Sequence, residues 1–156
     1  MSETDPARIV ADADVLAADL LVGGSAREVL DQIRQHDWLT LVASDELLAD
    51  TRYIIATLAA EDLATDWYAR IEDERSAVSH PAEDHPALAS AYRGNAAHLV
   101  SFDENLTSAA TNRSLQSHVT LSIRTPDAFA TLFDPESLYE SLYDDTYSGP
   151  DRDPRE

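Results

Sequence analysis

The sequence predicts an α/β fold: a three-layer α/β/α sandwich around a central parallel sheet of four to five strands. Short apolar runs typical of buried parallel strands occur four times along the 156 residues. One or two segments with helical periodicity separate each run from the next, as parallel connections require, because a helix must return the chain to the same edge of the sheet. The length suits a single domain with a sizeable core.

The first strand is expected at residues 9–11, where an apolar run ends at Asp12 after a loose lead-in over residues 1–7. Helical periodicity follows over residues 13–22 and stops at the glycine pair 23–24. Ser25 is the expected N-cap of a second helix that ends near Gln35. Together these two helices would carry the chain back across the sheet.

Residues 38–43 are apolar and rich in strand formers, which predicts the second strand. Ser44 is expected to cap the helix that follows, whose first turn is acidic as the helix dipole favours. A further helix is expected over residues 61–78, the longest in the chain. The segment from Ser79 to Pro86 contains two prolines and marks a clear break.

Asp84 is expected to cap a helix over residues 86–93, with the Gly-Asn pair at 94–95 as its end. A strand over residues 98–102 then ends at Asp103, and a polar helix over residues 104–115 follows. The last strand is predicted at residues 119–123, before a helix opened by Thr125. A short helix over residues 136–143 completes one domain of residues 1–143, and the acidic tail, residues 144–156, is expected to be disordered.

The composition is strongly acidic. Thirty acids face eleven bases, giving a formal net charge of −19, and every base is arginine. At molar salt the Debye length falls to about 3 Å, so the self-repulsion of such a surface largely disappears. This indicates a protein of a salt-loving organism, and the alternative is an anionic surface with a function in ordinary salt. The chain has no cysteine, which excludes disulfides, thiolate zinc sites and cysteine nucleophiles.

No apolar run approaches the roughly 18 residues of a membrane span, so no membrane association is expected. The first residues are acidic where a secretory signal would be positively charged. A cytoplasmic location is therefore predicted.

Several acids stand at positions where the expected fold would gather them. Asp12 and Asp14 follow the first strand, Asp103 follows another, and Asp84 and Asp50 lie at or near helix starts. Ligands of open parallel sheets bind at the carboxyl ends of the strands. Carboxylate oxygens suit Mg²⁺ and Mn²⁺, which assist phosphodiester hydrolysis by activating water and neutralising charge. Each acid also has a structural explanation of its own, as a cap, a turn residue or a solvated helix acid.

The order of these motifs resembles the PIN domain family of metal-dependent ribonucleases, which includes the toxins of many toxin–antitoxin pairs. The resemblance covers roughly residues 8–133. It rests on Asp12-Ala13-Asp14 after the first strand, on the stretch from Ser44 to Asp50, and on Asp84-His85-Pro86 before a helix. It also rests on Ser101-Phe102-Asp103 after the next strand and on the closing segment from Ile123 to Phe129.

The resemblance implies hydrolysis of single-stranded RNA with Mg²⁺ or Mn²⁺, together with an antitoxin partner and a homodimer as expected associations. By position, Asp12, Asp84 and Asp103 would be metal ligands. Asp50 would be a further catalytic or outer-shell acid, with Glu46 as its alternative one helical turn earlier. The residues in supporting roles would be Asp14 and Ser101, which orient ligands or water, and Arg52 and Arg93, which contact phosphate.

Other interpretations stay open. The chain could be a non-catalytic PIN-like binding or regulatory module, or an acidic interaction protein in which Asp12, Asp84 and Asp103 point to different regions. His80 and His85 flank one loop and could bind zinc, although no third matched ligand accompanies them. The stripe of Leu138, Tyr139, Leu142 and Tyr143 suits either a dimer interface or packing on its own domain.

Overall fold

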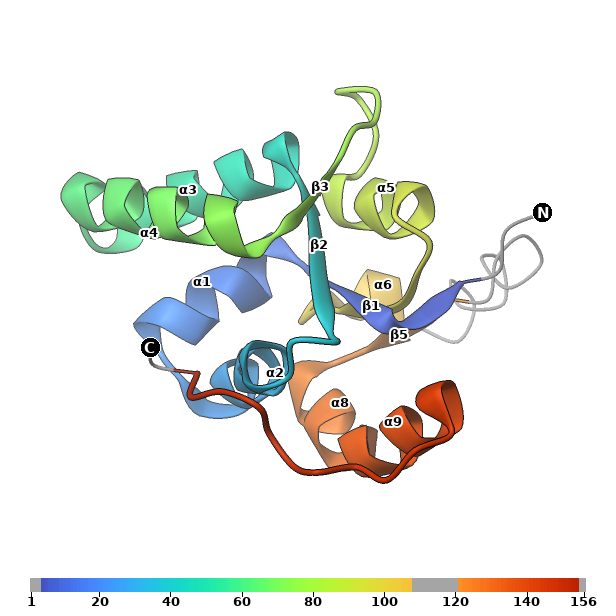
Figure 1. The fold of residues 1–156 in the computed structure, drawn as a ribbon. Coiled ribbons are helices and arrows are strands. Elements are labelled where there is room, and N and C mark those ends of the chain that lie inside the picture. Colours follow the sequence, from blue (N-terminus) through green and yellow to red (C-terminus); the bar gives the residue numbers. More distant parts are fainter. Residues whose placement is uncertain (1–3, 108–120, 155–156) are drawn as a thin grey trace.

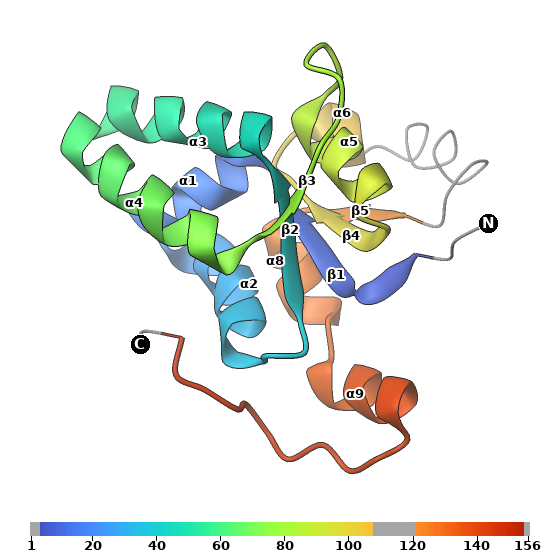
Figure 2. The same cartoon turned by 45° about the horizontal axis from the view of Figure 1, so that its top comes forward.

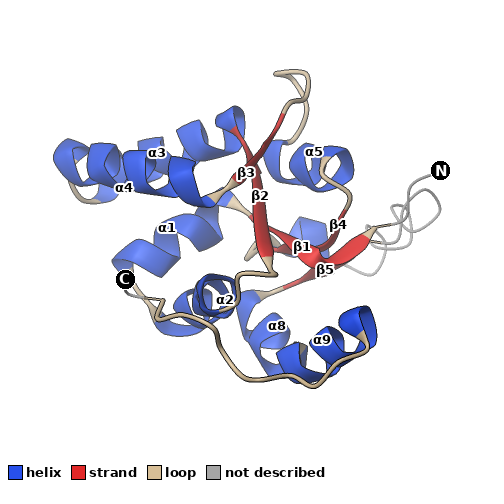
Figure 3. Ribbon diagram, in the orientation of Figure 1, coloured by secondary structure: helices blue, strands red, loops and turns tan. Residues whose placement is uncertain are grey.

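A computed structural model of the chain describes residues 4–107 and 121–154. Five strands form one sheet in the order β3-β2-β1-β4-β5, and every neighbouring pair is parallel. Helices cover both faces of this sheet, which confirms the predicted three-layer α/β/α architecture (Figures 1 and 3). The strands are β1 (Asp5–Ala11), β2 (Thr40–Ser44), β3 (Ser76–Val78), β4 (Ala96–Val100) and β5 (Ser122–Arg124).

The helices divide between the two faces according to the order of the strands. The chain moves from β1 through β2 to β3 in one direction and then returns past β1 to β4 and β5. Right-handed crossovers in opposite directions put their helices on opposite faces. Accordingly, α5 packs on β1, β2 and β4, whereas α2 packs against α1 and α8 on the other side (Figure 2). The helices are α1 (Ala13–Leu21), α2 (Gly24–Gln35), α3 (Asp45–Leu58), α4 (Glu61–Glu74), α5 (Pro86–Arg93), α6 (Glu104–Thr107), α8 (Pro126–Leu132) and α9 (Pro135–Tyr143).

The core lies on both sides of the three central strands. Consecutive residues of β1, Ile9 and Val10, are both fully buried, as are Leu99 and Val100 of β4. Successive strand side chains point to opposite faces, so burial of both requires cover on both. This arrangement explains why the strands are continuous apolar runs rather than alternating ones.

Several predicted helix caps are present. Ser44 Oγ accepts the backbone N–H of Leu47 at 3.1 Å, and Thr125 Oγ1 accepts that of Ala128 at 3.2 Å. The helix α5 has the predicted bounds. Two other expected caps are wrong: α2 begins after Gly23, whose φ of 90° suits a residue without a side chain, and α5 is capped by His85 instead of Asp84. The backbone N–H of Asp84 instead closes a turn on the carbonyl of Pro81.

Strand structure occurs in two places where the sequence predicts a helix or a loose lead-in. The helix expected over residues 61–78 ends at Glu74, and β3 follows and pairs with β2. Arg75 fixes this change of direction, because its guanidinium donates to the carbonyl of Ala43 at 2.9 Å and to Asp45 at 2.6 Å. In addition, β1 begins at Asp5, within the segment expected to be a loose lead-in. The backbone N–H of Asp5 donates to the carbonyl of Asn95 at 2.7 Å and so extends the pairing with β4.

Two further predicted elements are described only in part. The helix expected over residues 104–115 is described as α6, and its remainder lies outside the described residues. The last strand is β5, shifted toward the C-terminus of the expected range, whose first two residues also lie outside the described part.

The C-terminal tail departs from the expected disorder, because residues 144–154 run along the end of α2 (Figure 1). The Tyr147 hydroxyl lies 2.6 Å from His36 Nε2, and the Asp151 carboxylate accepts the backbone N–H of Asp37 at 2.9 Å. The N–H of Asp151 donates to the carbonyl of Gln35 at 2.8 Å. The tail thus provides a partner for one of the carbonyls that every helix leaves open at its C-terminus.

The aromatic stripe on α9 packs on its own domain. Trp38 meets the rings of Tyr139 and Tyr143 edge to face, at centroid distances of 5.3 and 6.2 Å. Leu142 remains 39% exposed and Tyr143 51%. Intramolecular packing therefore accounts for the tyrosines, and the homodimer stays a prediction.

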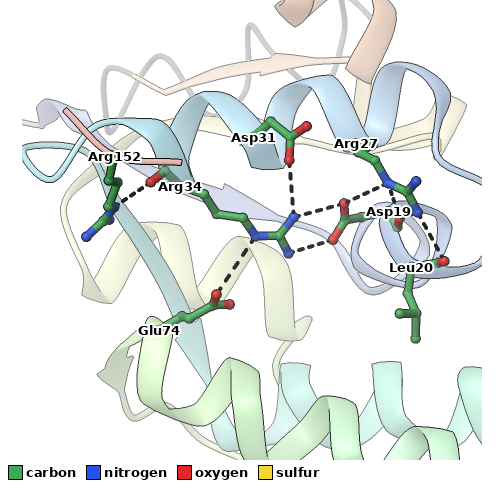
Figure 4. A network of polar contacts seen from close by, with 7 residues as sticks. All are labelled: Asp19, Leu20, Arg27, Asp31, Arg34, Glu74 and Arg152. Carbon is green, nitrogen blue, oxygen red and sulfur yellow. Dashed lines mark hydrogen bonds and ion pairs between the residues drawn. The ribbon is translucent and has the colours of Figure 1, made fainter. Parts of the chain in front are cut away.

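A buried ion pair joins α1, α2 and α4 (Figure 4). Asp19 is 5% exposed, and its carboxylate accepts two hydrogen bonds from Arg34, at 3.1 and 2.7 Å. Burial opposes the charge of Arg34, but Asp19, with help from Glu74 and Asp31, outweighs that effect and raises the pKa of the guanidinium. Arg27 donates to the backbone carbonyl of Asp19 at 2.7 Å. These hydrogen bonds and ion pairs replace the water that the charges of Asp19 and Arg34 lose on folding.

Within the described residues, no helix combines the length and the apolar character that crossing a bilayer requires.

Candidate active site

The sheet has one topological switch point, between β1 and β4. The chain leaves β1 toward β2 on one side, while β4 lies on the other side and leads to β5. Open parallel sheets bind ligands in the crevice at the carboxyl ends of the strands that flank such a point. Asp12 directly follows β1, and Ser101 directly follows β4, so both lie at this place.

Ser101 joins the two strand ends. Its hydroxyl donates to Asp12 Oδ2 at 2.7 Å and accepts the backbone N–H of Asp103 at 3.0 Å. The other oxygen of Asp12 accepts the N–H of Ala13 at 2.8 Å, and the Asp12 N–H donates to the carbonyl of Val100 at 2.9 Å. Ser101 is fully buried. The structure therefore brings Asp12, Ser101 and Asp103 together and fixes the orientation of the Asp12 carboxylate.

Asp14 adds a third carboxyl in the first turn of α1. Burial, and then the charge of Asp12, raises its pKa from 3.8 to about 6. Asp103 adds to the rise, and backbone hydrogen bonds with Val15 and Phe102 oppose it. Asp14 Oδ1 is buried and has no hydrogen-bond partner among the described residues. This crowding of acids leaves an acceptor that a proton or a cation would satisfy.

By donor type, these groups fit Mg²⁺ or Mn²⁺, which prefer carboxylate oxygen. Within residues 4–107 and 121–154, no three histidine, aspartate or glutamate side chains are placed closely enough to hold an ion by themselves. Mg²⁺ is commonly held by one or two carboxylates together with water and substrate phosphate. An ion at this place would need further ligands from water or from a substrate phosphate.

The structure does not join the other two predicted acids to this group. Asp84 is exposed in the loop before α5, and Asp50 is exposed on α3. The helix α3 begins directly after β2, at the carboxyl edge of the sheet, whereas the loop of residues 79–85 separates β3 from α5. No hydrogen bond or ion pair in the described part of the chain connects either acid to Asp12 or Asp103.

Glu46, the alternative to Asp50, lies beside His80 at the end of β2. The His80 side chain is fully buried, with Nδ1 2.8 Å from the carbonyl of Pro81 and Nε2 2.8 Å from Ser44 Oγ. A carbonyl only accepts, so Nδ1 carries the proton and Nε2 accepts from the hydroxyl. The Glu46 carboxylate is 3.9 Å from Nε2. Since both ring nitrogens are engaged and His85 caps α5, a structural role fits this pair better than zinc binding.

The two arginines expected to contact phosphate lie elsewhere. Arg52 donates to Thr65 at 3.1 Å and stands over the ring of Tyr68 at 5.3 Å, so it is held by α4. Arg93 ends α5, whose eight residues carry it about 12 Å from the edge where the carboxylates lie. Arg124, which the sequence interpretation missed, ends β5 at that edge, and its carbonyl accepts the Ser101 N–H at 3.0 Å. An arginine that closes a predicted strand is the signal that could have identified it.

A family model matches residues 3–155, and it describes a family of unknown function (DUF7384). The comparisons with curated proteins and with solved structures gave no match.

Proposed function

The chain belongs to a family of unknown function (DUF7384), and we propose that it is a metal-dependent endoribonuclease of PIN type. One observation carries the proposal: at the switch point of a parallel sheet, a buried serine after β4 holds the Asp12 carboxylate after β1 and also accepts the backbone N–H of Asp103. This is the place where such sheets bind ligands. The motif order over residues 8–133, which resembles PIN domains, points to the same chemistry.

In this proposal, Asp12 and Asp103 hold a Mg²⁺ or Mn²⁺ ion, and Asp84 approaches from the start of α5. The ion would activate water and neutralise charge on a phosphodiester. Ser101 orients Asp12 through its hydroxyl, at 2.7 Å. Asp14, whose pKa is about 6, supplies negative charge that a cation would stabilise. Asp50 or Glu46 completes the acidic group as an outer-shell residue.

Single-stranded RNA is the proposed substrate. Phe102, between Ser101 and Asp103, is 45% exposed beside the carboxylates and offers a ring on which an unpaired base can stack. The charge of −19 opposes RNA binding in dilute buffer, but molar salt reduces that repulsion to short range. We therefore expect activity at high potassium chloride. The toxin role and the antitoxin partner belong to this proposal.

The alternative is a non-catalytic PIN-like module that binds RNA or a partner protein. Such a module would keep the fold and the acids at the switch point without a competent catalytic site. A purely structural acidic protein is less well supported, because the charges of both Asp12 and Asp103 act on the half-buried carboxyl of Asp14.

The test is cleavage of end-labelled single-stranded RNA in 2 M potassium chloride, with Mn²⁺ or with chelator. We expect Mn²⁺-dependent products that carry a 5′-phosphate from the wild-type protein and none from Asp12→Asn. Asp66→Asn, which removes an exposed charge on α4, is the matched control and should cleave normally. Equal cleavage by all three proteins would point to a contaminating nuclease and contradict the proposal. RNA retention without cleavage would support the non-catalytic module.

A further inference from the structure

A cavity outside the candidate active site lies between the strands β4 and β5 and the helices α8 and α9. Its volume is about 480 Å³, within the range of small-molecule sites. Residues of α8, of α9 and of the turn between them line its other side. The residues that matter for its chemistry are His98, Arg124, Phe129, Phe133, Asp134 and Ser137.

His98, in the wall of this cavity, has a ring nitrogen without a hydrogen-bond partner among the described residues. This nitrogen, Nδ1, is buried. Burial, with a smaller effect from Arg124, lowers its pKa to about 4. The imidazole is therefore neutral in the physiological range, and a neutral ring offers one donor and one acceptor. The ring as a whole is half-buried and lines the cavity, so a ligand with a donor or an acceptor at its edge can meet it there.

An aromatic stack forms one wall. The rings of Phe129 and Phe133 are stacked, with centroids 4.8 Å apart and an interplanar angle of 16°. The His98 ring meets both edge to face, at 5.4 and 6.1 Å. Phe129 is 2% exposed, whereas Phe133 is only half-buried, so the stack can be extended on the Phe133 side. A planar ring fits such a wall.

Arg124 brings a positive charge to the same cavity. No ion pair with a carboxylate is formed by its guanidinium among the described residues. The nearest acid in the lining, Asp134, uses one oxygen to cap α9, accepting the N–H of Ser137 at 3.3 Å. The Arg124 backbone is bonded to Ser101, which holds Asp12. The backbone of Arg124 thus links the cavity wall to the strand end that carries the candidate active site.

We propose that this cavity binds a nucleotide, with the base against Phe133, the base edge at His98 and the phosphate at Arg124. The shared chemistry is a planar heteroaromatic base that carries a phosphate, and it can come from a free mononucleotide or from one nucleotide of an RNA chain. The second source rests on the proposed function. In that case the cavity selects the nucleotide beside the phosphodiester that is cut.

The experiment records the ring nitrogen signals of His98 by NMR in 2 M potassium chloride with chelator, in the Asp12→Asn background. Cleavage cannot occur there, so the result is independent of the nuclease proposal. The probes are the four nucleoside 5′-monophosphates, ribose 5-phosphate, and short RNAs with and without one abasic nucleotide. We expect at least one mononucleotide to shift the His98 signals saturably, with ribose 5-phosphate binding about tenfold more weakly.

Variants test the phosphate contact at Arg124 and the base contact at Phe133 separately. Arg124→Gln and Phe133→Leu should each weaken nucleotide binding about tenfold, whereas Arg70→Gln, which removes an exposed charge on α4 outside the cavity, should not change it. If an abasic RNA binds more weakly than the intact RNA, the chain nucleotide is the ligand; if only free nucleotides bind, the cavity is a separate effector site. Unchanged His98 signals with every probe, or equal binding of ribose 5-phosphate and mononucleotides, would overturn the inference.

Discussion

Replacing Asp14 by Asn should stabilise the protein at neutral and alkaline pH. The pKa of this carboxyl rises from 3.8 to about 6 on folding, because burial and the charge of Asp12 disfavour its ionised form. Below pH 3.8 the group is protonated in both the folded and the unfolded chain, and it has no effect. As the pH rises through 6, the folded chain must ionise it, and stability is lost.

The full cost of that ionisation is about 3 kcal/mol. The side chain is only half-buried, so water screens part of the interaction, and we expect about 1.5 kcal/mol. Asp14→Asn should thus raise the free energy of unfolding by about this amount at pH 8, and by about half as much at pH 5. Urea unfolding followed by tryptophan fluorescence, in 2 M potassium chloride with chelator, measures both values.

The control for this prediction is Asp66→Asn, whose exposed carboxylate should give no comparable gain. Adding Mn²⁺ should raise the free energy of unfolding of the wild-type protein more than that of the Asp14→Asn variant. The difference in stability between the two proteins should therefore become smaller. The reasoning fails if Asp14→Asn is less stable than the wild type at pH 8, or if the difference is the same at pH 5 and pH 8.

Three further changes test other parts of the structure. Asp19→Ala should lower the free energy of unfolding by about 3–5 kcal/mol, because it leaves Arg34 with a largely buried, poorly paired charge. In the same urea assay, the double variant Asp19→Ala with Arg34→Met should recover part of this loss. Gly94→Ala should cost about 1–3 kcal/mol, since its Cβ would lie 2.5 Å from Val42 Cγ1, and an unchanged melting temperature would contradict this. Ser101→Ala should weaken Mn²⁺ binding about 10- to 100-fold in calorimetry through loss of the hydrogen bond to Asp12, whereas Ser101→Thr should retain most of the affinity.

The position of the candidate site could be predicted from the sequence to a considerable extent. An apolar run that ends abruptly at Asp12, and another followed by Ser101 and Asp103, mark two strand ends, and parallel strands share one carboxyl edge. The structure joins these residues through the Ser101 hydroxyl. The bounds of α5 were predictable for a similar local reason, since Pro86 fixes its start and Gly94 its end.

Other features depend on contacts that local sequence does not encode. Ile71 and Val78 lie seven residues apart and fit one helical face, so periodicity extends the helix past its true end. The strand β3 exists because Arg75 reaches the carbonyl of Ala43 and because β2 offers an edge for pairing. The tail packs on α2 through single polar contacts, such as that of Tyr147 with His36, which composition cannot reveal.

For the same reason, the sequence could not predict whether Asp84 and Asp50 lie close to Asp12. Whether Asp84 or Asp50 can approach the carboxylates depends on the path of the loop before α5 and on the rotation of α3, not on their order in the sequence. Both side chains are exposed, and neither is bonded to Asp12, Ser101 or Asp103 in the described residues.

A crystal structure with Mn²⁺, measured at a wavelength where manganese scatters anomalously, tests the central claim most directly. The account predicts an anomalous peak at the carboxyl ends of β1 and β4, at about 2.0–2.3 Å from oxygens of Asp12 and Asp103. The same crystals grown from Asp12→Asn should lack the peak. A wild-type structure in which these carboxylates hold no manganese at saturating concentration, or in which the ion binds elsewhere on the acidic surface, would contradict it.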